Sequence, residues 1–239
     1  MFVNPTFPLE KKRLNRLNEL CLHYAFLNRI FFVKPDRTFL DELIAGEVLH
    51  AFPLSSEQSL EQEGKQALQA FAAANAGGLS EETFEALKKD YQRLFVGPGH
   101  LPAPPWESVY RSREHLVFEK ETLDVRRWYA RFGLQAPKFN QEPDDHIGLE
   151  FAFLLHLTTL ALQNQVDQEA CAPLLQAQRA FIEEHLVQWA PSFFQAVSKH
   201  AATEFYRGVG YLGSAILDEV ASDFEVRIPE LQEYKLGSD

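Results

Sequence analysis

The stretch that decides the fold runs from Glu142 to Leu162 and reads EPDDHIGLEFAFLLHLTTLAL. Residues 147–162 are nearly all apolar, and Glu150 and His156 are their only ionisable side chains. The length and composition of this run predict a helix over about 145–164. It is too short and too polar to span a bilayer. We therefore expect a buried helix that begins at a polar cluster.

Helical patterns also fill the rest of the chain. Apolar residues recur every three or four positions from Leu14 to Leu27, which predicts a helix over about 9–33. Ser80, followed by Glu81 and Glu82, is typical of a helix start. Further helices are expected at about 36–51, 57–75, 80–96, 121–133, 168–187, 189–200 and 201–222. Only 109–117 could be extended, so we predict an all-α fold: one globular domain of roughly eight to ten helices over 1–239.

Composition narrows the possible partners. The formal net charge of −11 argues against nucleic acid and against an anionic membrane surface, because both attract basic proteins. A basic partner is favoured instead. The two cysteines, Cys21 and Cys171, indicate neither a disulfide framework nor a zinc site. Residues 1–13 lack the apolar segment of a secretory signal, so we expect a cytoplasmic protein.

One segment interrupts the helical pattern. Residues 97–106 read GPGHLPAPPW and contain four of the 13 prolines, so they form neither a helix nor a central strand. The segment could be a stiff linker between helical halves. It could also form the rim of a binding groove, since a stiff loop loses little entropy on binding. Trp106 and Tyr110 would then add contact surface.

The polar cluster at 141–150 also has two interpretations. Asp144 or Asp145 could simply cap the following helix and complement its dipole. Capping explains neither the neighbouring His146 nor the abrupt change to an apolar helix. A binding role for the cluster therefore stays open.

At these two segments the sequence resembles the DmsD/TorD family of redox-enzyme maturation chaperones. Residues 91–98 (YQRLFVGP) and 104–110 (PPWESVY) are similar to one family motif, and 142–148 (EPDDHIG) to a second. Residues 185–189 (HLVQW) and 205–207 (FYR) are similar to its closing segments. Within the family, the Gly-Pro and Pro-Pro-Trp pattern resembles the DmsD branch.

The resemblance implies a non-enzymatic chaperone with a single all-α domain and no cofactor. Its partners would be the twin-arginine leader and the apo-form of a molybdopterin oxidoreductase catalytic subunit of the dimethyl-sulfoxide-reductase type. The chaperone would hold this client back from export until its cofactor is inserted. The Tat translocase is a further candidate partner, and we expect no nucleic acid and no membrane insertion. The expected peptide-binding residues are Tyr91, Leu94, Phe95, Pro104, Pro105, Trp106, Ser108, Tyr110, Glu142, Asp144, Asp145 and His146.

The chemistry of these residues matches what a twin-arginine leader requires. Two guanidiniums need carboxylates, which Glu142, Asp144 and Asp145 could supply. The apolar part of the leader needs a hydrophobic trough, expected from Tyr91, Leu94, Phe95 and Trp106. A neutral His146 could accept a hydrogen bond from a guanidinium and would repel it when charged. Binding is therefore expected to weaken below about pH 6.5.

Two other functions stay open. His146 and Glu150 are four residues apart, so a metal-dependent helical enzyme can be imagined. The sequence contains neither His-Glu-x-x-His nor Gly-x-Ser-x-Gly, which weakens that interpretation. The other alternative is a helical adaptor for a different partner.

Overall fold

The computed structural model describes residues 10–46, 49, 59–112, 116–137, 140–165 and 167–230. Within these ranges every regular element is helical, and an isolated β-bridge joins Trp106 to His146. The all-α prediction is confirmed. The chain separates into two compact units: described residues up to Phe32 with 106–189 and 220–229, and residues 33–105 with 190–219 and Glu230. The expectation of one domain over 1–239 stays a prediction.

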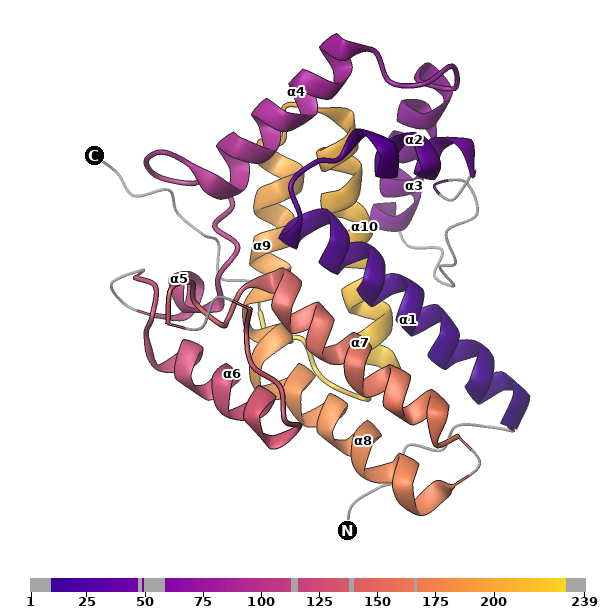
Figure 1. Cartoon of the computed structure of the whole chain (residues 1–239), viewed down its shortest axis with the longest axis vertical. Helices are drawn as coiled ribbons and strands as arrows, with labels where there is room; N and C mark the ends of the chain where they lie inside the picture. Colours follow the sequence, from indigo (N-terminus) through magenta and orange to yellow (C-terminus); the bar gives the residue numbers. More distant parts are fainter. Residues whose placement is uncertain are drawn as a thin grey trace. The chain divides into compact units, whose positions relative to one another are not determined.

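The first unit is built around the apolar helix. It contains α1 (Glu10–Phe32), α5 (Glu107–Arg111), α6 (Lys120–Arg131), α7 (Ile147–Gln163), α8 (Gln168–Phe181) and the π-helical turn η2 (Ile182–Leu186). Helix α7 packs against both α1 and α8 and lies between them (Figure 1). This position explains its composition, because a helix covered on two sides must be apolar around most of its circumference.

Gly148 allows α7 to approach α1 closely. A Cβ atom at this position would lie 2.5 Å from Cβ of Phe32 and 3.0 Å from its backbone nitrogen. The Asn28 side-chain amide also donates to the Gly148 carbonyl at 2.7 Å. Packing between α1 and α7 therefore requires a glycine at position 148.

Aromatic rings fill the space between α6, α7 and α8. The centroid of the Phe153 ring lies 4.8 Å from that of Phe181 and 5.1 Å from that of Tyr129. Trp128 is nearly perpendicular to Phe181 at 5.8 Å. These edge-to-face and tilted arrangements add to the stabilisation that comes from burying large apolar surfaces.

The second unit contains α2 (Arg37–Ala45), α3 (Ser59–Ala74), α4 (Glu81–Tyr91), the π-helical turn η1 (Gln92–Val96) and most of α9 (Val187–His200) and α10 (Glu204–Asp223). Ser80 caps α4 as predicted, because its hydroxyl accepts from the Thr83 N–H at 3.1 Å. Helices α9 and α10 lie close together, since a Cβ at Gly213 would be 2.3 Å from the Phe194 ring.

Two local predictions need correction. Residues 109–111, the start of the 109–117 segment that could have been extended, belong to the short helix α5, while residues 113–115 lie outside the described residues. The second helix ends at Ala45 with Gly46 as its C-cap, earlier than expected, while residues 47–48 and 50–51 lie outside the described residues. No described helix is both long and apolar enough to cross a membrane.

Candidate peptide-binding site

The two segments that stand out in the sequence meet in the first unit. Trp106 and His146 form an antiparallel bridge, and the Glu107 N–H donates to the Asp145 carbonyl at 3.0 Å. The indole of Trp106 and the imidazole of His146 lie edge to face, with centroids 6.0 Å apart. The proline-rich loop therefore ends directly beside the polar start of α7, as the sequence predicted.

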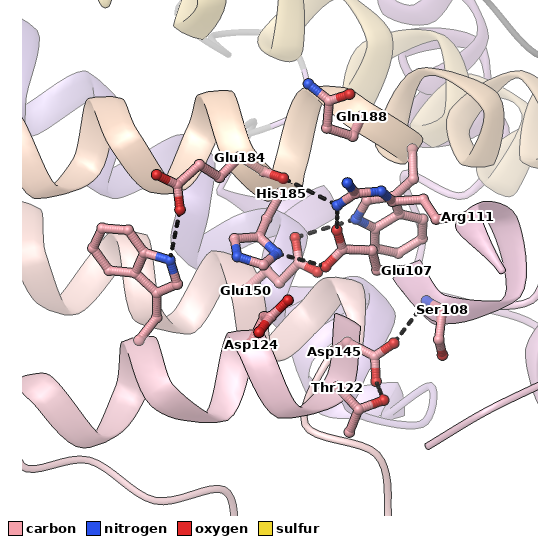
Figure 2. A network of polar contacts seen from close by, with 12 residues as sticks. Glu107, Ser108, Arg111, Thr122, Asp124, Asp145, Glu150, Glu184, His185 and Gln188 are labelled. Carbon is pink, nitrogen blue, oxygen red and sulfur yellow. Dashed lines mark hydrogen bonds and ion pairs between the residues drawn. The ribbon is translucent and has the colours of Figure 1, made fainter. Parts of the chain in front are cut away.

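Asp145 holds this junction together through both carboxylate oxygens. Oδ2 accepts from the Ser108 N–H at 2.7 Å, and Oδ1 accepts from the Thr122 hydroxyl at 2.7 Å (Figure 2). The residue is fully buried. Burial raises the pKa of this carboxyl, while the hydrogen bonds from Ser108 and Thr122 oppose the rise. Asp145 thus satisfies an N-terminal N–H of α5, a helix distant in sequence.

The expectation that Asp144 or Asp145 caps α7 is wrong. His146 is the N-cap, because its Nδ1 accepts from the Gly148 N–H at 3.0 Å. Asp145 cannot reach that N–H because its oxygens are turned toward α5 and α6. The imidazole takes the place of the usual hydroxyl or carboxylate cap.

This cap fixes the chemistry of His146. Since Nδ1 accepts a hydrogen bond, the neutral ring carries its proton on Nε2, which is a donor. The residue keeps part of its surface accessible, yet desolvation by its surroundings lowers the pKa of His146 to about 3. Phe32 contributes to this apolar environment, with ring centroids 5.4 Å apart. The expectations that His146 accepts from a guanidinium and titrates near pH 6.5 are therefore corrected.

Asp144 also forms an ion pair within the first unit. Its Oδ2 accepts from Nη2 of Arg126 at 2.6 Å and from Nε at 3.1 Å, and only 1% of the residue is exposed. Among the described residues, Oδ1 has no hydrogen-bond partner. Glu142, by contrast, lies on the surface. Of the three acids predicted to bind guanidiniums, Glu142 is the accessible one in this structure.

A second buried network includes Glu107, the residue that follows Trp106. The Glu107 carboxylate pairs with the Arg111 guanidinium and lies 2.8 Å from Nδ1 of His185 (Figure 2). The Trp189 indole donates to the fully buried Glu150 at 3.3 Å. Desolvation, together with Glu107 and Asp145 nearby, raises the pKa of Glu150 well above its usual value. The environment thus favours the neutral acid at Glu150.

Sequence reasoning missed this network. The buried Trp189 belongs to the 185–189 segment, which the sequence analysis noted only for its similarity to the family's closing segments. The partners were not foreseeable, because Glu107 is 78 residues from His185. Among the described residues, no group of three His, Cys, Asp or Glu side chains is placed to hold a metal ion.

The remaining predicted residues differ in accessibility. Ser108 is fully buried, whereas Tyr110 keeps part of its surface and lies 5.3 Å from the Trp189 ring. Tyr91, Leu94, Phe95, Pro104 and Pro105 belong to the second unit and are buried. There the Phe95 ring contacts those of Tyr91, Tyr206 and Phe193 at centroid distances of 5.3, 5.7 and 6.1 Å. Of the residues expected to form the trough, Tyr91, Leu94 and Phe95 are core residues in this structure, whereas Trp106 in the first unit is partly accessible.

These features define an all-helical protein with a tryptophan-bearing loop fixed against a buried polar helix start. Residues 57–195 match the family described as nitrate reductase delta subunit. Because this match spans more than half of the sequence, the chain belongs to that family.

Similar proteins carry more specific names. The chain is 37% identical over 133 residues to the Tat proofreading chaperone DmsD of Salmonella typhi, covering 56% of this chain and 59% of that relative's length. It is 25% identical over 222 residues to a probable Tat proofreading chaperone DmsD of Haemophilus influenzae, covering 92% and 99%. It is 28% identical over 198 residues to the chaperone protein TorD of Vibrio cholerae, covering 82% and 87%. The resemblance to the DmsD/TorD family is confirmed.

Proposed function

We propose that this protein is a cytoplasmic chaperone that binds the twin-arginine leader of a molybdopterin oxidoreductase and holds the enzyme back from export until its cofactor is inserted. The family membership and the relatives named as Tat proofreading chaperones support this role. The contact between Trp106 and His146 is the structural observation that carries the proposal. The apo-enzyme body and the translocase are the further partners we propose.

The structure changes the roles we assign within the site. Glu142 supplies the accessible carboxylate for an arginine of the leader. His146, with its proton on Nε2, donates to a backbone carbonyl of an extended leader segment. Trp106 and Tyr110, both partly accessible, provide contact for apolar leader residues.

The remaining residues have supporting roles in this proposal. Asp145 and Ser108 position the loop through their hydrogen bond, and Asp144 holds Arg126. Tyr91, Leu94, Phe95, Pro104 and Pro105 are proposed contacts for the apolar part of the leader, to which they become available only when the second unit rearranges. In this proposal the affinity for the leader depends on the rearrangement of the second unit. A ligand binds less tightly when the binding-competent conformation of the protein is rarely populated.

Calorimetry with a twin-arginine leader peptide tests the function. We expect the Lys-Lys version of the peptide to bind about tenfold more weakly, since lysine cannot form the bidentate contact. Glu142→Gln should weaken binding, while Glu183→Gln, which removes the same charge from another exposed site of the first unit, should not. Trp106→Ala should also weaken binding, with exposed Leu22→Ala as its control. Absence of heat with the native leader would refute leader binding.

A further inference from the structure

The first unit contains a cavity of about 330 Å³ whose lining has the opposite charge to the chain as a whole. Residues of α5, α6 and η2 line it. Four of its side chains are cationic and two acidic: Arg111, Lys120, Arg127 and Arg131 against Asp124 and Glu184. The chain carries a formal net charge of −11, so a basic cavity on it requires an explanation.

Two of the four cations are occupied by acids. Arg111 pairs with buried Glu107 and donates to the Glu184 carbonyl at 3.0 Å (Figure 2). Arg127 pairs with Asp124. Contacts within the protein therefore explain the positions of Arg111 and Arg127.

Of the other two cations, Lys120 forms only a long, exposed ion pair, and Arg131 forms none with the described residues. The Lys120 side chain is 84% exposed, and its ammonium lies 4.0 Å from Asp124. The Arg131 guanidinium lies over the Trp128 ring, 4.5 Å from its centroid, and no carboxylate of a described residue is within ion-pair distance of it. Stacking on an indole orients a guanidinium and leaves its edge N–H donors available to an anion.

Exposed apolar residues lie close in sequence to the residues that line the cavity. Leu116, Val117 and Phe118 precede Lys120 with Glu119 between them, and Leu123 follows Lys120 by about one helical turn. Leu123 is four residues before Arg127, so it lies on the same face of α6 as Lys120 and Arg127. Phe118 has φ of 64°, a left-handed conformation that is unfavourable for a bulky residue, yet 47% of its surface is exposed. An exposed aromatic ring held in this way is typical of a contact surface.

We propose that this cavity binds an acidic peptide segment in which carboxylate side chains flank an aromatic or aliphatic residue. The carboxylates pair with Lys120 and Arg131, and the apolar side chain lies against Phe118 and Leu123. The apolar rim distinguishes such a segment from a free inorganic anion, which would use only the cations. The proposal does not depend on the leader site, whose ligand is cationic.

Fluorescence anisotropy of a labelled Glu-Glu-Phe-Leu-Glu-Glu peptide tests the cavity, with Gln-Gln-Phe-Leu-Gln-Gln as the uncharged control. The double variant Lys120→Gln/Arg131→Gln should weaken binding about fivefold, as expected for two solvent-exposed ion pairs. The matched variant Lys12→Gln/Arg179→Gln removes the same charge from an exposed and a partly exposed position of the first unit outside the cavity and should bind normally. Phe118→Gly should also weaken binding without lowering thermal stability, because glycine relieves the strained backbone.

Three results would overturn the proposal. The glutamine peptide could bind as tightly as the glutamate peptide. The cavity variant and its matched control could lose the same affinity, which would indicate a general charge effect. Inorganic phosphate could displace the peptide where chloride of equal ionic strength does not, which would assign the cavity to small anions.

Discussion

The neutral state of His146 gives the sharpest test of the site. Desolvation lowers its pKa in the folded protein to about 3, whereas an unfolded histidine titrates near 6.5. Between these two pH values the unfolded chain binds a proton that the folded protein does not. The contribution of His146 to stability is therefore present above pH 6.5 and is lost as the pH falls toward 3. At pH 5 the loss amounts to about 2 kcal/mol.

His146→Asn isolates this effect. Asparagine can still accept from the Gly148 N–H as a helix cap, but it does not titrate. We would measure the free energy of unfolding in urea for both proteins at pH 8 and pH 5. Asp145 and Glu150, whose raised pKa values act with the opposite sign, are present in both proteins and cancel in the comparison. The advantage of the native protein over the variant should shrink by about 2 kcal/mol at pH 5.

Nuclear magnetic resonance provides an independent measurement. The ring protons of His146, assigned by their absence from the variant spectrum, should not shift between pH 8 and pH 5. A ring titrating near pH 6.5, or a stability difference that does not depend on pH, would refute the desolvation argument. Either result would also restore the expectation that leader binding weakens below pH 6.5 through this residue.

Two further predictions concern the packing and hydrogen bonds that support the site. Gly148→Ala places a Cβ atom 2.5 Å from that of Phe32, so α1 and α7 must separate at a cost of about 1–3 kcal/mol, and an unchanged melting temperature would contradict this close approach. Asp145→Asn retains the shape of the side chain but cannot accept from both Ser108 and Thr122, so the free energy of unfolding in urea should fall by about 1–3 kcal/mol. An unaltered value would show that these hydrogen bonds contribute little.

The fold was largely predictable because local patterns determine most of its helices. The first helix was expected over about 9–33 and spans Glu10–Phe32, and the apolar helix expected over 145–164 spans Ile147–Gln163. Helix α5 was not predicted, because its stabilising carboxylate, that of Asp145, is 37 residues from Ser108 along the chain. A cap supplied from such a distance leaves no local pattern.

The candidate site was predictable in position but not in chemistry. The two motifs correctly predicted that Trp106 lies beside His146. They could not reveal that Asp144 pairs with Arg126 or that Gly148 determines the tautomer of His146, because both depend on three-dimensional contacts. The basic cavity was hidden for a different reason: its cations lie among acids in a chain with a strong negative net charge.

The contacts around the start of α7 also determine which experiments can identify a binding residue. Asp145 accepts a hydrogen bond from α5, His146 caps α7, and Gly148 allows α1 to approach closely. A substitution at any of these positions disturbs the junction, so lost leader binding would not distinguish contact from support. Trp106 and Glu142 are accessible. A loss of affinity at Glu142 with unchanged stability therefore indicates direct contact, whereas a loss confined to Asp145 or Gly148 indicates that the motif only builds the junction.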